Sequence, residues 1–196
     1  MELLFIDGCI SQRGPGSRTR ALADAFLSAF REGHPEAAVE TVSLEALDLR
    51  PFLPPALDER DALASIGAFD APVFDLARQF RRADAIVAAA PLWDLSFPAV
   101  MRIYIEHVSV CGLCYHYEAD GCHGDCKAAR LAYLTTGGDR EGPQSLGPLH
   151  WEQLAAMCGI PRFDYVFAGG LDLDPEKAPA LLEAACEKAR RLGREF

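Results

Sequence analysis

The sequence has no apolar segment long enough to cross a membrane. A spanning helix needs about 18 consecutive apolar residues, and the longest candidate, around Ala85–Leu92, has the length of one buried strand. The N-terminus also lacks a basic segment followed by a long apolar stretch, so we expect no signal peptide. These absences predict a cytoplasmic protein with no membrane partner.

Basic residues are also in short supply. The chain has 19 Lys and Arg against 29 Asp and Glu, which gives a formal net charge of −10. A protein that binds nucleic acid needs a clustered basic surface to neutralise phosphates, and the basic residues here are scattered along the chain. We therefore expect no nucleic-acid partner. The length of 196 residues predicts a single α/β domain, residues 1–196, with its own hydrophobic core.

The seven cysteines do not indicate a secreted disulfide framework, because their number is odd and no secretion signal precedes them. Four of them gather in one short segment with two histidines nearby: Cys111, Cys114, Cys122 and Cys126, with His116 and His123. This spacing allows a zinc site, a redox-active dithiol or plain free thiols. Cys111 also follows a predicted core helix, where a thiol behaves as a small apolar group. We favour free thiols and expect no metal.

Short apolar runs alternate with segments of helical periodicity along the whole chain. The predicted strands are Leu3–Ile6, Val39–Leu44, Ala85–Ala90, Leu131–Thr135 and Tyr165–Ala168. The first predicted helix starts after Ser17, its N-cap, and the second starts near Val73. The third covers Phe97–Val108, with Pro98 in its first turn. The fourth covers Leu146–Cys158, and the last runs from Asp174 towards Arg194. A proline-rich connection, Asp48–Pro72, has room for a short helix near Glu59–Ile66. Five strand–helix units predict a five-stranded parallel sheet with helices on both faces.

In such sheets a ligand binds beyond the carboxyl ends of the strands. The loop after the first predicted strand, Asp7–Thr19, brings Ser17, Arg18 and Thr19 to the start of a helix. A helix N-terminus offers free N–H groups and a positive dipole end to an anion. The segment therefore predicts a phosphate site, although an ordinary capped helix has the same sequence pattern.

Two further loops follow buried strands. Pro91, Leu92, Trp93, Asp94 and Leu95 come after the third, and the large aromatic side chain there is placed to line a flat ring. Alternatively, Trp93 closes the top of the core. Thr135, Thr136, Gly137 and Gly138 follow the fourth strand, where paired glycines let a ligand approach the backbone or simply make a turn.

With these loops, the chain resembles the flavodoxin-like NAD(P)H-dependent oxidoreductases, which include FMN-dependent azoreductases and relatives of the quinone reductases. The similar segments lie in the family's order and cover nearly the whole chain: Ser17–Ala23, Ala88–Trp93, Pro98–Tyr104, Gly112–Tyr117, Thr135–Gly138 and Phe167–Gly170. The resemblance implies a flavodoxin-like fold and a homodimer with its active site near the subunit interface.

The resemblance also implies where FMN binds. Its phosphate would lie at Ser17–Thr19 and its ring against Pro91–Leu95 and Thr135–Gly138. Cys9 stands where a hydroxyl residue often helps to hold the phosphate. Asp94 stands where the family often has Asn, and either it lies near the ring and lowers the reduction potential or it caps the helix near Phe97.

The implied activity is reduction of a quinone, an azo compound or a related small acceptor with NADH or NADPH. The cofactor carries the hydride chemistry, the protein orients the reactants, and the two half-reactions follow a ping-pong order. Tyr115, His116 and Tyr117 lie in the hairpin that overhangs the flavin in the family, where one of them donates a proton or stacks on substrate, unless all three are plain exposed hairpin residues. The alternative function is a non-enzymatic FMN-binding electron carrier of flavodoxin type.

Overall fold

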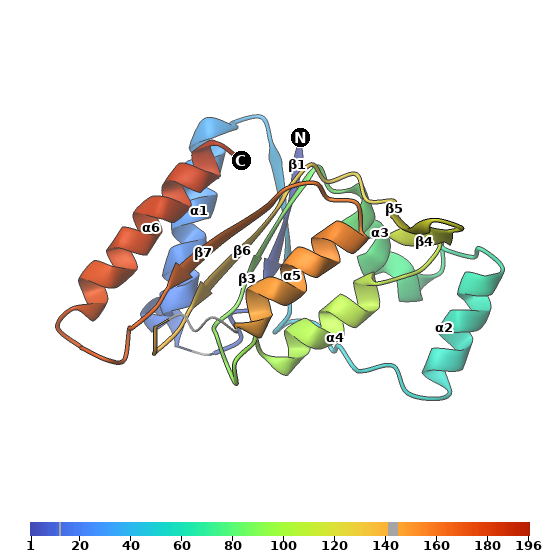
Figure 1. The fold of residues 1–196 in the computed structure, drawn as a ribbon, viewed down its shortest axis with the longest axis horizontal. Helices are drawn as coiled ribbons and strands as arrows, with labels where there is room; N and C mark the ends of the chain where they lie inside the picture. The colour runs from blue at the N-terminus through green and yellow to red at the C-terminus, as the bar shows by residue number, and fades with distance from the viewer. Residues whose placement is uncertain (12, 141–144) are drawn as a thin grey trace.

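The computed structural model describes residues 1–11, 13–140 and 145–196. Its centre is a five-stranded parallel sheet (Figure 1). The strands are β1 (Glu2–Asp7), β2 (Ala38–Ser43), β3 (Ala85–Ala89), β6 (Leu131–Thr136) and β7 (Phe163–Ala168), in the spatial order β2-β1-β3-β6-β7. This is the flavodoxin-like strand order, in which the connections from β1 and β3 diverge at a switch point. The predicted fold class is confirmed.

Helices cover both faces of the sheet, as predicted (Figure 1). The helices α1 (Arg18–Gly33) and α6 (Ala178–Arg194) pack together on one face, and α3 (Asp75–Arg82), α4 (Ala99–Val108) and α5 (Leu146–Met157) lie on the other. Two short 3₁₀ turns, Gly14–Gly16 and Pro72–Phe74, precede α1 and α3. The helix in the proline-rich connection, α2 (Ala56–Ser65), has no buried residue. No helix among the described residues is long and apolar enough for a membrane span.

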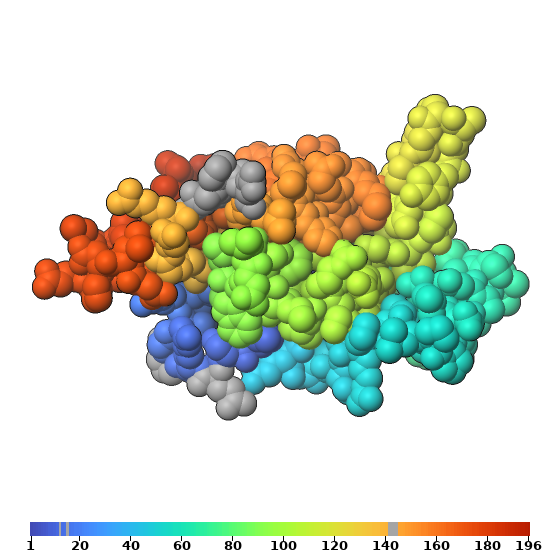
Figure 2. Space-filling model, turned by 60° about the horizontal axis from the view of Figure 1, so that its bottom comes forward, coloured from blue at the N-terminus to red at the C-terminus, as the bar shows by residue number. Residues whose placement is uncertain are grey.

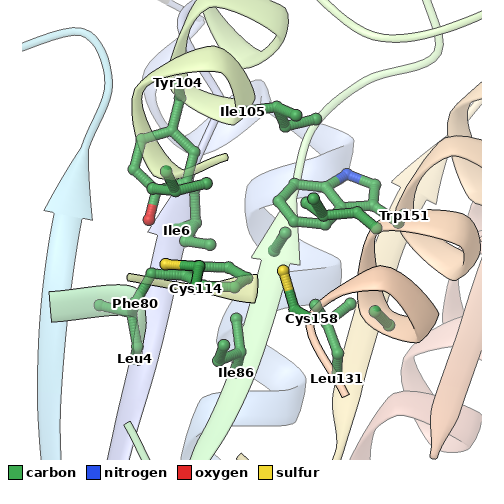
Figure 3. Close-up of a cluster of buried hydrophobic side chains, with 14 of the residues drawn as sticks. Leu4, Ile6, Phe80, Ile86, Tyr104, Ile105, Cys114, Leu131, Trp151 and Cys158 are labelled. Carbon is green, nitrogen blue, oxygen red and sulfur yellow. The ribbon is translucent and has the colours of Figure 1, made fainter. Parts of the chain in front are cut away.

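The sheet divides the core into two clusters because successive strand side chains point to opposite faces. On β1, Leu3 and Phe5 pack under α1 and α6, whereas Leu4 and Ile6 belong to the cluster under α3, α4 and α5. That second cluster includes Tyr104 and Trp151, which are fully buried (Figure 3). The residues of both clusters come from all parts of the chain. Their packing therefore fixes the positions of the loops at the carboxyl ends of the strands relative to one another.

Three predicted boundaries move in the structure. The last helix begins at Ala178, not at Asp174, because the Asp174 Oδ1 atom accepts from the backbone N–H groups of Glu176 and Lys177 in a preceding turn. Pro98 is the N-cap of α4 and not a first-turn residue. The short helix α2 starts three residues earlier than expected, since the chain turns at Pro55, its N-cap.

A two-stranded antiparallel hairpin follows α4. Its strands are β4 (Tyr115–Glu118) and β5 (Gly121–Gly124). The hairpin projects from the body of the molecule as the olive and yellow protrusion in Figure 2. Its base is held where the backbone N–H of Cys126 donates to the Cys158 carbonyl oxygen over 3.2 Å.

Candidate functional site: a cavity at the carboxyl edge of the sheet

Three loops that follow β1, β3 and β6 meet beyond the carboxyl ends of these strands, together with the loop after β7. They enclose a cavity of about 160 Å³. The residues that line it are Ser11, Arg13, Ser17, Arg18, Thr19, Pro91, Leu92, Trp93, Thr136, Gly137, Gly138, Leu171 and Asp172. The strand order places the cavity at the switch point between β1 and β3, where this fold binds ligands.

The start of α1 supplies hydrogen-bond donors to the cavity. The Ser17 hydroxyl oxygen accepts from the backbone N–H of Arg20 over 3.3 Å and so caps the helix. The first intrahelical bond joins the Ala21 N–H to the Ser17 carbonyl oxygen, so the N–H groups of Arg18 and Thr19 precede it and are donors for a ligand. Arg13 and Arg18 add positive charge. This set of donors and charges fits a phosphate group.

A hydrogen bond joins this helix start to the end of β6. The hydroxyl oxygens of Thr19 and Thr136 are 2.6 Å apart, and both side chains are buried. Beside it, the guanidinium of Arg20 pairs with the buried carboxylate of Asp7. These contacts fix the first loop against the sheet on the floor of the cavity.

The loop after β7 closes the opposite side of the cavity. An Arg18 guanidinium nitrogen lies 2.6 Å from the Asp172 carboxylate, and the Asp172 N–H donates to the Gly138 carbonyl oxygen over 2.9 Å. A Cβ atom at Gly138 would come within 2.3 Å of the Asp172 carboxylate. Glycine therefore leaves the room that the acidic side chain needs to reach Arg18.

The loop after β3 contains a tight turn. Backbone hydrogen bonds link Trp93 and Ser96 in both directions, at 3.3 and 2.8 Å. Asp94 and Leu95 between them have φ angles of 49° and 68°, the left-handed values that a two-residue hairpin turn needs at both central positions. The turn leaves the Trp93 side chain 42% exposed at the cavity wall. Trp93 therefore does not close the top of the core.

The family model that matches the chain is described as flavodoxin-like fold and covers residues 1–192. A relative from Clostridium acetobutylicum, named FMN-dependent NADH:quinone oxidoreductase 2, is 30% identical over 200 residues, with 100% of this chain and 99% of that protein covered. The chain belongs to this flavodoxin-like family of FMN-dependent oxidoreductases.

Other similarities agree with this family. An FMN-dependent NADH:quinone oxidoreductase from Clostridium beijerinckii is 28% identical over 100% of this chain and 99% of its own length. The fold is similar to the crystal structure of azoreductase from Bacillus anthracis, with a TM-score of 0.85, 22% identity and both chains fully covered. An FMN-dependent NADH-azoreductase from the same species, in complex with FMN, has a TM-score of 0.81 at 16% identity over 98% and 99% of the two chains.

Most of the predicted cofactor residues of this flavodoxin-like chain line the cavity. They are Ser17, Arg18, Thr19, Pro91, Leu92, Trp93, Thr136, Gly137 and Gly138. Four predicted residues do not line it: Asp94 and Leu95 lie in the exposed turn, Thr135 is fully buried, and Cys9 lies under the loop. The sequence prediction missed Ser11 and Arg13, which lie in the first loop, and Leu171 and Asp172, whose only signal is the Gly169–Gly170 pair after the fifth strand.

Cys9 is held against the end of the sheet instead. Its backbone N–H donates to the Asp7 carboxylate over 3.0 Å, and its Sγ atom is 4.0 Å from the Ala89 carbonyl oxygen. Burial and the nearby Asp7 carboxylate raise the pKa of the Cys9 thiol to about 12. The thiol is therefore protonated at neutral pH and is a small core side chain.

The alternative role of Asp94, as a cap of the helix near Phe97, is wrong. Helix α4 starts at Ala99 with Pro98 as its N-cap, and no side chain caps it. Asp94 is separated from that helix start by the tight turn, which directs the chain away before the helix begins.

Tyr115, His116 and Tyr117 lie at the other end of the sheet. The hairpin leads into Lys127, whose Nζ atom is 2.6 Å from Asp84 at the amino end of β3, whereas the cavity lies beyond the carboxyl end. The five residues of β3 separate the two ends by about 17 Å. Within one chain, these three residues and the cavity do not meet.

The seven cysteines are all free thiols. Cys111 is exposed and does not pack in the core as predicted, whereas Cys114 is fully buried. The neighbouring Cys126 thiol and burial raise the pKa of Cys114. In the part of the chain that the structure describes, no cysteine belongs to a group with metal-ligand spacing.

Proposed function

We propose that this chain is an FMN-dependent NADH oxidoreductase that reduces quinone or azo acceptors in two separate half-reactions. The observation that carries the proposal is the cavity at the carboxyl edge of the sheet, where a helix start, two arginines and a glycine pair converge. Full-length similarity to FMN-dependent NADH:quinone oxidoreductases supports the choice of cofactor and reductant.

Each loop has a distinct part in holding FMN. The helix start at Ser17–Thr19 would hold the phosphate, together with the guanidinium of Arg18, which in this structure is paired with Asp172. The Trp93 wall and the Gly137–Gly138 backbone on the opposite side flank the ring, since glycine allows close approach. FMN held there would supply the hydride-transfer chemistry between NADH and the acceptor, while the protein would supply position and charge.

We also propose that the site is completed in a homodimer. A cavity of about 160 Å³ is smaller than the roughly 300 Å³ at which ligand pockets for larger molecules begin, so the ring extends past its rim. Trp93 lines that rim, and three further exposed apolar side chains lie in the turn after it and in the first turn of α5: Leu95, Leu146 and Leu149. The backbone bond from the Leu146 N–H to the Leu95 carbonyl oxygen, 3.1 Å long, keeps two of them adjacent.

Exposed apolar side chains gathered at one rim mark a contact surface. Light scattering of the purified protein tests the dimer: we expect twice the chain mass, and the chain mass for a Leu149→Glu variant. A fully active wild-type monomer would contradict it. The hairpin projects away from its own chain. In a dimer, Tyr115, His116 and Tyr117 would therefore act in catalysis only at the flavin of the partner subunit.

The test of the activity is pre-steady-state kinetics without oxygen. NADH mixed with the FMN-loaded protein should bleach the flavin absorbance in the absence of an acceptor, and a quinone or azo dye added afterwards should restore it. Flavin that NADH does not reduce would refute the enzyme and favour the electron carrier. Initial rates at several fixed acceptor concentrations should give parallel double-reciprocal lines.

A further inference from the structure

The hairpin segregates its side chains by chemistry. Opposite residues of an antiparallel pair share a face, and His116 pairs with His123 as Tyr117 pairs with Cys122. One face therefore has the two tyrosines, whose rings are 5.8 Å apart, and Cys122, whose Sγ atom is 3.9 Å from the Met157 carbonyl oxygen. The other face has two imidazoles, stacked 5.7 Å apart, and Glu118.

The polar face converges on one point near the tip of the hairpin. One ligand atom from each of Glu118, Asp120 and His123 lies within 4.8 Å of the other two. The His123 Nε2 atom is 2.8 Å from the Asp120 carboxylate, and the His116 Nε2 atom is 3.2 Å from the Glu118 carboxylate. Ligands of a tetrahedral ion with bonds of about 2.0 Å are roughly 3.3 Å apart, so the Glu118, Asp120 and His123 atoms need only small shifts to surround one ion.

A further carboxylate supports the histidine from behind. The Asp125 carboxylate lies 2.8 Å from the His116 Nδ1 atom, which directs the Nε2 atom of the same ring towards Glu118. Carboxylates that bind metals are themselves held by hydrogen bonds, and His116 holds Glu118 in this way. Among the described residues, no lysine or arginine pairs with Glu118, Asp120 or Asp125; histidines are their ion-pair partners.

We propose that the polar face of this hairpin binds one divalent transition-metal ion through Glu118, Asp120 and His123, while His116 positions the Glu118 carboxylate. Imidazole nitrogens with carboxylate oxygens and no sulfur select an ion of the zinc type over calcium, magnesium or copper(I). The thiols are excluded by the alternation of the strands, because Cys122 faces the opposite side. The site is separate from the flavin cavity and does not depend on the proposed activity.

Cobalt(II) is the probe, because its visible absorption reports both geometry and ligand type. We expect the FMN-loaded protein, freed of metals with a chelator, to bind one Co²⁺ per chain, detected as a difference spectrum against the flavin and displaced by Zn²⁺. A His123→Ala variant should lose this binding. An Asp125→Asn variant, which keeps all three ligands but weakens the hold of His116 on Glu118, should bind about 10-fold to 100-fold more weakly.

The matched control is Cys122→Ser, on the other face of the same hairpin, which should bind Co²⁺ as the wild type does. Asp120→Asn, an exposed change in the turn, gives a second ligand variant, and circular dichroism verifies that each variant folds. Unchanged Co²⁺ affinity in both His123→Ala and Asp120→Asn would overturn the proposal. So would a sulfur-to-cobalt charge-transfer band that disappears in Cys122→Ser.

Discussion

The hydrogen bond between Thr19 and Thr136 joins the first loop to the sheet, and its energy can be isolated. The two hydroxyl oxygens are 2.6 Å apart, and the side chains are 3% and 7% exposed. Replacement of Thr19 by Val keeps the shape and leaves the Thr136 hydroxyl buried without its partner. That change costs about 1–3 kcal/mol, which for a domain of this size lowers Tm by roughly 2–4 °C per kcal/mol.

The double variant, Thr19→Val with Thr136→Val, is the decisive comparison. With both hydroxyls gone, neither threonine position leaves a buried hydroxyl without a partner. We therefore expect the double variant to lose less free energy of unfolding than the two single variants lose in sum, by about 1 kcal/mol or more. Urea denaturation of the FMN-free proteins measures the three free energies of unfolding. Additive effects would refute the direct bond, and so would single variants as stable as the wild type.

Three other predictions concern positions outside the cavity. Gly124→Ala should lower Tm strongly in thermal denaturation, because its Cβ would come within 1.9 Å of the Gly159 backbone nitrogen, whereas Gly16→Ala, whose Cβ meets nothing within 4 Å, should not. The raised pKa of Cys9, about 12 against 9.0, means that the unfolded state loses this proton first, so the free energy of unfolding should fall as pH rises from about 9 to 12. A Cys9→Ala variant should show a smaller fall, because Cys114 and Cys126, whose pKa values are also raised, keep their own contributions. Asp94→Asn should raise the reduction potential of bound FMN by no more than about 20 mV in a redox titration, since a screened charge interaction of about 1 kcal/mol is its ceiling; a larger shift would mean that Asp94 faces the ring.

The parallel sheet and the three loops could be predicted because their signals are local. Apolar runs gave the strands, and Ser17 was predicted as an N-cap from its place before a helical pattern, as the structure confirms. The loops after β1, β3 and β6 meet because parallel strands bring their carboxyl ends to one edge.

What could not be predicted depends on contacts between distant residues or on backbone conformation. Asp172 reaches Arg18 only through the fold, 154 positions away in the sequence. Asp94 has the residue type of a helix cap, but its left-handed conformation in a tight turn removes that role. The spacing of the cysteines and histidines allows a shared zinc site in the sequence. In the hairpin, strand alternation places Cys122 on the face opposite to the two histidines.

The central claim is that FMN binds with its phosphate at the start of α1, and a flavin titration of the FMN-free protein tests it most directly. We expect a yellow wild-type protein with one FMN per chain. For the double variant Ser17→Ala with Thr19→Ala we expect an affinity at least about 10-fold lower, because the loss of the Ser17 hydroxyl removes one hydrogen bond to a charged group, about 1.5–3 kcal/mol, and the loss of the Thr19 hydroxyl releases the helix start from Thr136. Asp94→Asn, outside the cavity, is the control and should bind as the wild type does. A double variant that folds and binds FMN with unchanged affinity would place the phosphate elsewhere and contradict the account.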